Sequence, residues 1–126
     1  MIGFVLILFG SVYTLNQNDV SAHIPDASNF SPTSKDWKIT FSKRMNPDTF
    51  TSHSVKVTNQ KNEAVPVSFQ WNKDHTILTL VAPEGGYTRD ETYEIFISKD
   101  VESINGKPLK KSYQHPFTAC KESPTI

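Results

Sequence analysis

The sequence predicts an all-β fold in which six or seven short strands form a sandwich. Apolar and polar residues alternate along several short runs, and turn-forming residues separate these runs at regular intervals. The chain has 126 residues, of which 37% are hydrophobic, a length and composition that fit one small domain with one core.

The alternation is clearest where the predicted domain begins. Trp37, Ile39 and Phe41 alternate with Lys38 and Thr40. Side chains point alternately to the two faces of a strand, so the apolar residues are expected to face inward and the polar ones outward. The same period of two occurs in the runs 55–58, 65–72 and 93–98, and a last strand is expected over 113–119.

Two runs carry additional information. Residues 76–82 are apolar on both sides, which favours a central strand, whereas Pro66 cannot donate a hydrogen bond to a sheet and predicts an edge strand. In the run 93–98, Phe96 breaks the polar face and is expected to point outward. The residues expected to line the core are Trp37, Phe41, Val67, Phe69, Leu78, Leu80, Tyr93 and Ile95.

Turn signals lie between the predicted strands. The polar segments 59–62 and 72–75 are expected to be hairpin connections, 83–86 a longer loop, and Asn105-Gly106 a tight turn. One short helical turn is also expected, because Asn46 can cap a helix and Pro47 suits its first position.

The N-terminal segment predicts export. Residues 2–15 are apolar and uncharged, but they are shorter than the roughly 20 residues of a spanning helix, as in a signal peptide. Val20-Ser21-Ala22 predicts cleavage after Ala22, with 1–22 as signal peptide or weak membrane anchor, 23–34 as linker, 35–119 as the domain and 120–126 as a tail. No Lys or Arg precedes Lys35, so either the true start lies upstream of Met1 or the segment stays as an anchor.

Residues 35–119 resemble the bacterial immunoglobulin-like domain first associated with S-layer proteins. The resemblance implies a seven-stranded sandwich that serves as a spacer, adhesion or cell-surface module and has no catalytic residues. It also implies that Tyr93 is the aromatic residue of the penultimate strand, with a hydroxyl that returns to the backbone as in a tyrosine corner. The segments that carry the resemblance are 39–47, 55–57, 76–80, 91–95, 104–109 and 117–118.

The residues do not predict an enzyme. The net charge is zero, which gives no indication of nucleic-acid binding. The sequence contains no Gly-x-Ser-x-Gly motif, and the single cysteine, Cys120, is expected in the tail. Asp90 and Glu91 are adjacent and would point to opposite faces of a strand, so they could not share a substrate. We therefore expect no cofactor and no catalytic residue.

The histidines leave one alternative open, a periplasmic or extracellular copper-binding sandwich. Cleavage after Ala22 would give His23 a free amine beside its ring, a pair that suits Cu(II), and His115 is the second candidate ligand. Copper-resistance sandwiches resemble this chain at that level, but Lys107 stands where their later ligand is expected. The main expectation for all four histidines is exposed loop or edge positions.

Two surface features bear on partners. Lys43, Arg44, Lys110 and Lys111 are expected to form a basic strip, best explained as protection of strand edges from pairing with other chains. Phe96 is expected either to cover a second layer or to anchor a partner on an exposed face. The function predicted is therefore that of an exported, non-enzymatic module at the bacterial cell envelope, with an unidentified envelope component or protein as partner and membrane contact only through the apolar segment.

Overall fold

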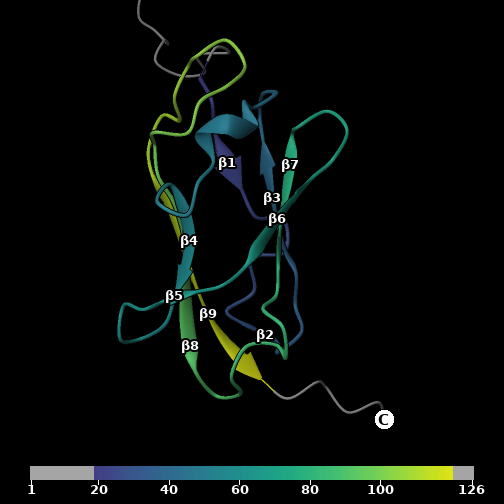
Figure 1. Cartoon of the computed structure of the whole chain (residues 1–126), viewed down its shortest axis with the longest axis vertical. Coiled ribbons are helices and arrows are strands. Elements are labelled where there is room, and N and C mark those ends of the chain that lie inside the picture. Colours follow the sequence, from purple (N-terminus) through teal and green to yellow (C-terminus); the bar gives the residue numbers. More distant parts are fainter. Residues whose placement is uncertain (1–18, 121–126) are drawn as a thin grey trace, which may run out of the picture.

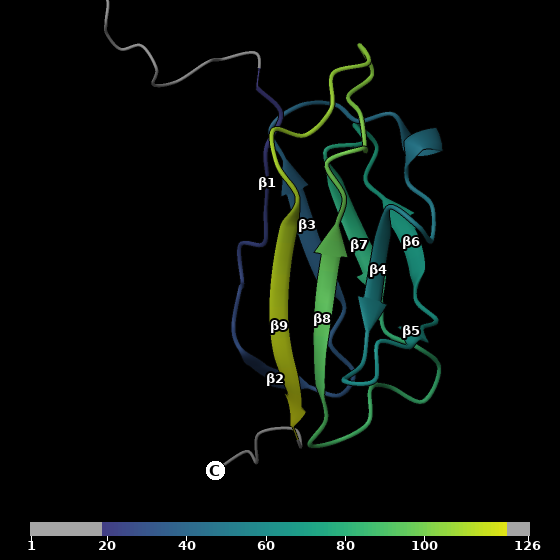
Figure 2. The ribbon, with the colours of Figure 1, turned by 90° about the vertical axis from the view of Figure 1, so that its left-hand side faces the viewer.

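The computed structural model describes residues 19–120, which form two β-sheets packed face to face (Figures 1 and 2). One sheet has the strand order β1-β3-β7-β6 and the other β2-β9-β8-β4-β5. Residues 1–18 of the expected signal or anchor segment 1–22, and residues 121–126 of the expected tail 120–126, lie outside the described residues. The strands are β1 (Ala22–His23), β2 (Phe30–Pro32), β3 (Trp37–Phe41), β4 (Val55–Thr58), β5 (Ala64–Val65), β6 (Ser68–Trp71), β7 (Ile77–Val81), β8 (Thr92–Ile97) and β9 (Tyr113–Cys120).

The predicted β-sandwich is confirmed, and the alternation along the sequence explains its layers. In β3, Trp37, Ile39 and Phe41 are buried, while Lys38 is exposed. The expected central strand is β7, which pairs antiparallel with β3 on one side and with β6 on the other. The expected helical turn is a 3-10 helix, Pro47–Thr49, and the Asn46 side chain caps it by accepting from the Asp48 N–H.

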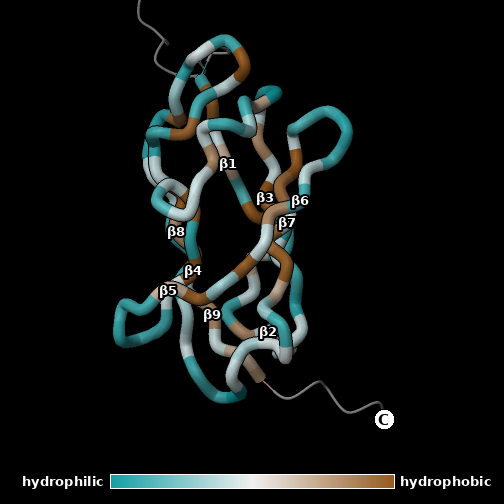
Figure 3. Tube along the Cα trace, in the orientation of Figure 1, coloured by the Kyte–Doolittle hydropathy of each residue, from teal (hydrophilic) through white to brown (hydrophobic). Residues whose placement is uncertain are grey.

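The core lies between the sheets. Figure 3 shows hydrophobic positions gathered along the strands and mostly hydrophilic positions in the connecting loops. The core residues expected from the sequence are buried, except that Val67 and Phe69 are only partly buried and pack against the others. The fully enclosed large side chains are Trp37, Phe117, Ile39, Met45, Leu78, Leu80, Ile95, Ile97, Val20, Val55, Val57 and Val101.

The segment expected to be a linker, 23–34, belongs to the sandwich. Its first residue, His23, belongs to β1, which pairs with β3, and its residues 30–32 form β2, which runs parallel to the end of β9. Val20 and Ile24 flank β1 and are 1% and 4% exposed. These strands have only two or three residues, which is too short to show an alternation of polar and apolar residues in the sequence. Hydrogen bonds to β3 and β9 hold them in the sandwich.

The run expected to be one edge strand, 65–72, is divided at Pro66. β5 ends at Val65 at the edge of one sheet, and β6 begins at Ser68 at the edge of the other. The proline lacks an N–H, which makes it suited to the crossing point where ladder pairing stops. Together with β1 and β2, this division gives nine strands in the described part of the chain, where the sequence predicted six or seven.

Cys120 was expected to lie outside the sandwich, and the structure places it in β9 instead. It is the last residue of that strand and pairs with Pro32 of β2. Pro116 also lies in β9, an internal strand, without disrupting it. It is tolerated because β2 pairs only with residues 118–120, so β9 is a free edge on that side at Pro116.

The described chain enters and leaves the sandwich at opposite ends (Figure 2). Asp19 and Val20 lie at the end formed by the loops after β3, β6 and β8, whereas β9 ends at Cys120 at the other end. No helix within residues 19–120 is long and apolar enough to cross a membrane.

Candidate functional site

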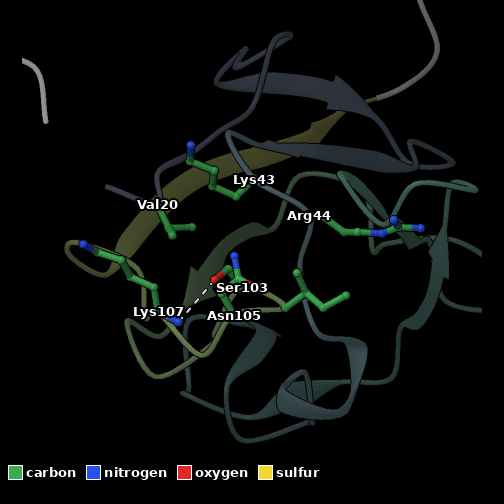
Figure 4. Close-up of a pocket in the computed structure, with 7 residues that line it drawn as sticks. Val20, Lys43, Arg44, Ser103, Asn105 and Lys107 are labelled. Atoms are coloured by element: carbon green, nitrogen blue, oxygen red, sulfur yellow. Dashed lines mark hydrogen bonds between the residues drawn. The ribbon is translucent and has the colours of Figure 1, made fainter. Parts of the chain in front are cut away.

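A surface cavity of about 390 Å³ lies at the end where the described chain begins (Figure 4). The loop after β3 and the loop between β8 and β9 form its walls, and the segment before β1 forms the remaining side. Its lining residues are Val20, Lys43, Arg44, Ser103, Ile104, Asn105 and Lys107.

Backbone hydrogen bonds fix the two loops against each other. The Ile104 N–H donates to the Arg44 carbonyl at 2.9 Å, and the Met45 N–H donates to the His75 carbonyl at 2.9 Å. Asn46 joins the same network, because its N–H donates to the carbonyl of Glu102 at 2.9 Å. The cavity walls are therefore held together by backbone hydrogen bonds, and His75 adds the loop between β6 and β7 to this network.

The segment 103–107 is a tight turn. The Ser103 N–H donates to the Lys107 carbonyl at 2.8 Å, and the buried Ser103 hydroxyl accepts from the Lys107 N–H at 3.2 Å. Gly106 has a φ of 84°, a left-handed conformation that favours glycine. The turn expected at Asn105-Gly106 is thus confirmed, and it places the Lys107 side chain at the rim of the cavity.

Val20 brings the N-terminal segment to this site. Its carbonyl accepts from the Lys110 N–H at 3.0 Å, and it forms an isolated parallel bridge with Leu109. Asp19 forms an ion pair with the Lys110 side chain at 3.3 Å. Cleavage after Ala22, as expected from the sequence, would divide β1 and remove Val20 from its buried position.

The cavity rim carries positive charge. Within residues 19–120, no ion pair involves Lys43, Arg44 or Lys107. Figure 4 shows the Lys43 and Lys107 side chains on the Val20 side of the cavity, whereas Arg44 extends in the opposite direction. Ammonium groups of this kind attract anions, and the residues that line the cavity include no His, Asp, Glu or Cys side chain.

The expected basic strip does not protect strand edges. Lys43 and Arg44 follow β3, and Lys110 and Lys111 precede β9, so all four residues lie in loops at the same end as the cavity. Strand pairing in the described chain leaves β6 and β1 at the edges of the four-stranded sheet, and neither contains a basic residue other than His23. Their shared position favours an electrostatic role for this end.

The two candidate copper ligands lie in different settings, which do not favour a copper site. His23 is exposed and sits in β1 opposite Thr40, within the fold and not ahead of it. His115 is 6% exposed, which corrects the expectation of an exposed position. Its Nε2 atom is 2.9 Å from the Ser28 carbonyl, and its ring packs edge-on against Trp37. Within residues 19–120, no three His, Cys, Asp or Glu side chains group in a way that could hold a metal.

Phe96 faces outward, as the alternation predicts. It is half-buried on the outer face of the five-stranded sheet, opposite Lys56 of β4 and Gln114 of β9. The Lys56 ammonium group lies 5.7 Å from the centre of its ring, within the range of a cation–π contact. The side chain is therefore partly covered by its neighbours and partly available to a partner.

The opposite end of the core contains three buried polar groups without a hydrogen-bond partner among the described residues. They are the hydroxyl of Tyr87, the indole nitrogen of Trp37 and the hydroxyl of Ser31. Burial, with a smaller contribution from Asp36 and then Tyr93, raises the pKa of the Tyr87 phenol well above its ordinary value. This phenol consequently stays neutral, and Tyr87 packs as part of the hydrophobic core.

Comparison with known proteins identifies the family. Residues 17–119 match the family described as a bacterial Ig-like domain, and the chain belongs to that family. The match begins before residue 35, in agreement with the place of β1 and β2 in the sandwich. The family description names an Ig-like domain and indicates no catalytic class. No curated protein sequence matches the chain.

Solved structures share the fold at low sequence identity. A fragment of native alpha-2-macroglobulin from Escherichia coli aligns with 83% of this chain at 20% identity and a TM-score of 0.61, over 34% of its own length. The N-terminal part of the bacterial S-layer protein SbsC aligns with 85% at 16% identity and a TM-score of 0.61, over 25% of its length. CopC from Methylosinus trichosporium OB3b aligns with 81% at 18% identity and a TM-score of 0.61, over 92% of its length.

These likenesses show the fold alone. In the structure of the native conformation of Escherichia coli alpha-2-macroglobulin, the chain spans only 6% of the length, so it corresponds to one small part of that protein. Sequence reasoning did not find the cavity, because Val20 and Ile104 are single apolar residues without a period. The signals in the sequence were the Asn105-Gly106 turn, which marks where the loop bends but not what it faces, and the expected basic strip, which includes the lining residues Lys43 and Arg44.

Proposed function

We propose that this chain is an exported bacterial Ig-like module that acts as a spacer at the cell envelope and binds partners through its surfaces. The observation that carries the proposal is the position of the two ends of the described chain at opposite ends of the sandwich (Figure 2). A module connected in this way keeps the segment before it apart from the segment after it. The eight residues of β9 alone extend over roughly 26 Å.

The interior supports a structural role. The inward-facing side chains of both sheets fill the space between them, and the large ones are fully enclosed. A small domain that uses its interior for its own core has no room there for a substrate. The cavity at the N-terminal end is lined by lysine, arginine, serine and aliphatic side chains, which suit attraction of an anion better than acid–base chemistry.

The cell-envelope location and the S-layer-like role are the finer part of the proposal. The apolar run at residues 2–15 supports export. The likeness to the S-layer protein SbsC supports a place among surface modules of that type. Phe96 is the proposed contact point on the outer face of the five-stranded sheet, because an outward aromatic residue can anchor a partner.

A phosphatase fusion tests the export step. Alkaline phosphatase, which is active only outside the cytoplasm, is joined to the C-terminus of the full chain in a bacterial host. We expect activity, and we expect it to be lost when residues 2–15 carry two added aspartates. A fusion protein that accumulates in the cytoplasm without phosphatase activity would overturn the proposal.

A pair of surface variants tests the binding face. Phe96→Ser should reduce retention of the exported chain in the envelope fraction, while Val81→Ser should not. Val81 is the matched control because it is half-buried like Phe96 but occupies an outward position of β7, in the four-stranded sheet. Equal retention of both variants and the native chain would remove Phe96 from the proposal and leave the spacer role.

A further inference from the structure

We propose that the end of the sandwich that carries the cavity docks on an anionic phospholipid surface. We call this surface the basic end and define it as the loops 42–54, 72–76 and 98–112 together with residues 19–21. Lysine side chains at the cavity rim would meet headgroup phosphates, and Ile104 would enter the interface between headgroups and acyl chains. The inference rests on the proposed function, because it needs the module outside the cytoplasm and beside a membrane.

The charges of the described chain are distributed unevenly between its two ends. At the basic end, Lys43, Arg44, Lys73, Lys99, Lys107, Lys110 and Lys111 outnumber Asp19, Asp48, Asp74, Asp100 and Glu102. In the loops of the opposite end, Asp26, Asp36, Glu63, Glu84, Asp90 and Glu91 outnumber Lys35, Lys61 and Arg89. The zero net charge of the chain hides this asymmetry, which would orient the module with its basic end toward an anionic surface.

An exposed apolar side chain lies among these cations. Ile104 is 60% exposed, and apart from Phe30 it is the only large hydrophobic residue so exposed within residues 19–120. It lines the cavity together with Lys43 and Lys107, and its backbone N–H is tied to the Arg44 carbonyl. An apolar residue surrounded by basic residues is the arrangement that peripheral membrane surfaces use.

The position of the apolar segment selects the lipid surface as the partner. Residues 2–15 are separated from Val20 by the four residues 16–19, which can span at most about 14 Å when extended. Whenever residues 2–15 occupy a bilayer, the basic end is the part of the module held next to it. A protein partner would have no such reason to meet this end.

Fluorescence on reconstituted full-length protein tests the proposal. In a Cys120→Ser background, an environment-sensitive label is attached to Ile104→Cys or, as a control at the opposite end, to Glu84→Cys. The protein is placed in vesicles of phosphatidylcholine, or of phosphatidylcholine with phosphatidylglycerol. We expect a blue shift at position 104 only in the vesicles that contain phosphatidylglycerol, reduced by 0.5 M salt, and no shift at position 84.

Charge variants separate headgroup binding from simple tethering. The label at position 104 is combined with Lys43→Gln and Lys107→Gln, or with the control pair Lys38→Gln and Lys61→Gln, which lie outside the basic end. Each cation near an anionic surface strengthens association about fivefold. The first pair of substitutions should therefore lower the equilibrium constant for docking, measured from the fraction of blue-shifted label, by about 25-fold, and the control pair should leave it unchanged.

Equal spectra in the two kinds of vesicle, or equal effects of the two lysine pairs, would overturn the proposal. Circular dichroism of each variant confirms that the fold is intact. Because the vesicle experiment uses purified protein, it is independent of the phosphatase fusion. Failure of export with a normal vesicle response would overturn the proposed function. Normal export without a vesicle response would overturn only the proposal that the basic end docks on lipid.

Discussion

The backbone N–H of Thr88 donates a hydrogen bond to the hydroxyl of Tyr93 at 2.8 Å. The donor lies in the loop before β8, and the acceptor comes from the second residue of that strand. Tyr93 is 5% exposed, and its ring stacks on Phe117 with centroids 5.5 Å apart. One side chain thus fills the core and also fixes the loop that leads into the strand.

Replacing Tyr93 with phenylalanine should lower the free energy of unfolding by about 1–2 kcal/mol, because the Thr88 N–H loses its acceptor while the ring contacts remain. Urea unfolding followed by tryptophan fluorescence measures the difference. An unchanged unfolding midpoint would show that water replaces the hydroxyl at no cost.

Replacing Tyr87 with phenylalanine should have the opposite result. The Tyr87 hydroxyl is buried and has no partner within residues 19–120, while its ring packs against Tyr93 and Phe117. Removal of an unpaired buried hydroxyl should leave stability unchanged or raise it by up to about 1 kcal/mol. The same urea experiment checks this, and a loss as large as that of Tyr93→Phe would reveal a hidden partner of the hydroxyl.

Alkaline pH should destabilise the native chain more than the Tyr87→Phe variant. Burial raises the pKa of Tyr87 in the folded protein, whereas in the unfolded chain the phenol ionises near its ordinary value of about 10. Above that pH the Tyr87 phenol is ionised in the unfolded chain while it is still neutral in the folded protein. The free energy of unfolding therefore falls by up to about 1.4 kcal/mol per pH unit. Thermal melts between pH 8 and 11 measure the slope, and parallel curves for the two proteins would contradict the assignment.

Truncating Trp37 to alanine should cost about 3–5 kcal/mol, a large part of the roughly 5–15 kcal/mol that stabilises a domain of this size. Trp37 is fully buried and packs against Phe117 with ring centroids 4.8 Å apart. Lys38→Ala, at the exposed neighbouring position, is the control and should change stability by less than about 0.5 kcal/mol. Thermal or urea unfolding of both variants makes the comparison.

A chain that begins at His23 should be less stable than one that begins at Asp19 by about 2–4 kcal/mol. The shorter chain lacks the buried Val20 and the hydrogen bonds of Val20 and Ser21 to the Lys110 and Ser42 N–H groups. Melting curves of the two purified chains test this. Mass spectrometry of the exported protein should accordingly find an N-terminus that retains Val20, and a mature start at His23 with undiminished stability would contradict the role of Val20.

The sequence was sufficient to predict those elements that carry their own pattern. The alternation of Trp37, Ile39 and Phe41 predicted β3 and its buried face, and the two-sided apolar run around Leu78 and Leu80 predicted the internal strand β7. The hydroxyl of Tyr93 returns to the backbone as the resemblance implied. These features depend on residues close together in the chain, where a single sequence is informative.

Elements held by distant partners could not be predicted in this way. β1 exists because Ala22 pairs with Phe41, and β2 because Phe30 pairs with Thr118. Two or three residues are too few to display an alternation of polar and apolar side chains. The positions of β1 and β2 are therefore determined by the strands with which they pair. The basic end has the same origin, because three loops and the N-terminal segment meet there only after the sandwich has formed.

The opposite placement of the two chain ends determines how the module would respond to tension. β1 runs away from the end where the chain enters, antiparallel to β3, and β9 runs toward the end where it leaves, beside β8 and β2 (Figure 2). A pull on both ends would therefore act along these strands and shear their hydrogen bonds together. Bonds loaded in parallel must break at once, whereas a hairpin pulled open from its end loses them one by one. The architecture is thus suited to bearing mechanical load along its long axis.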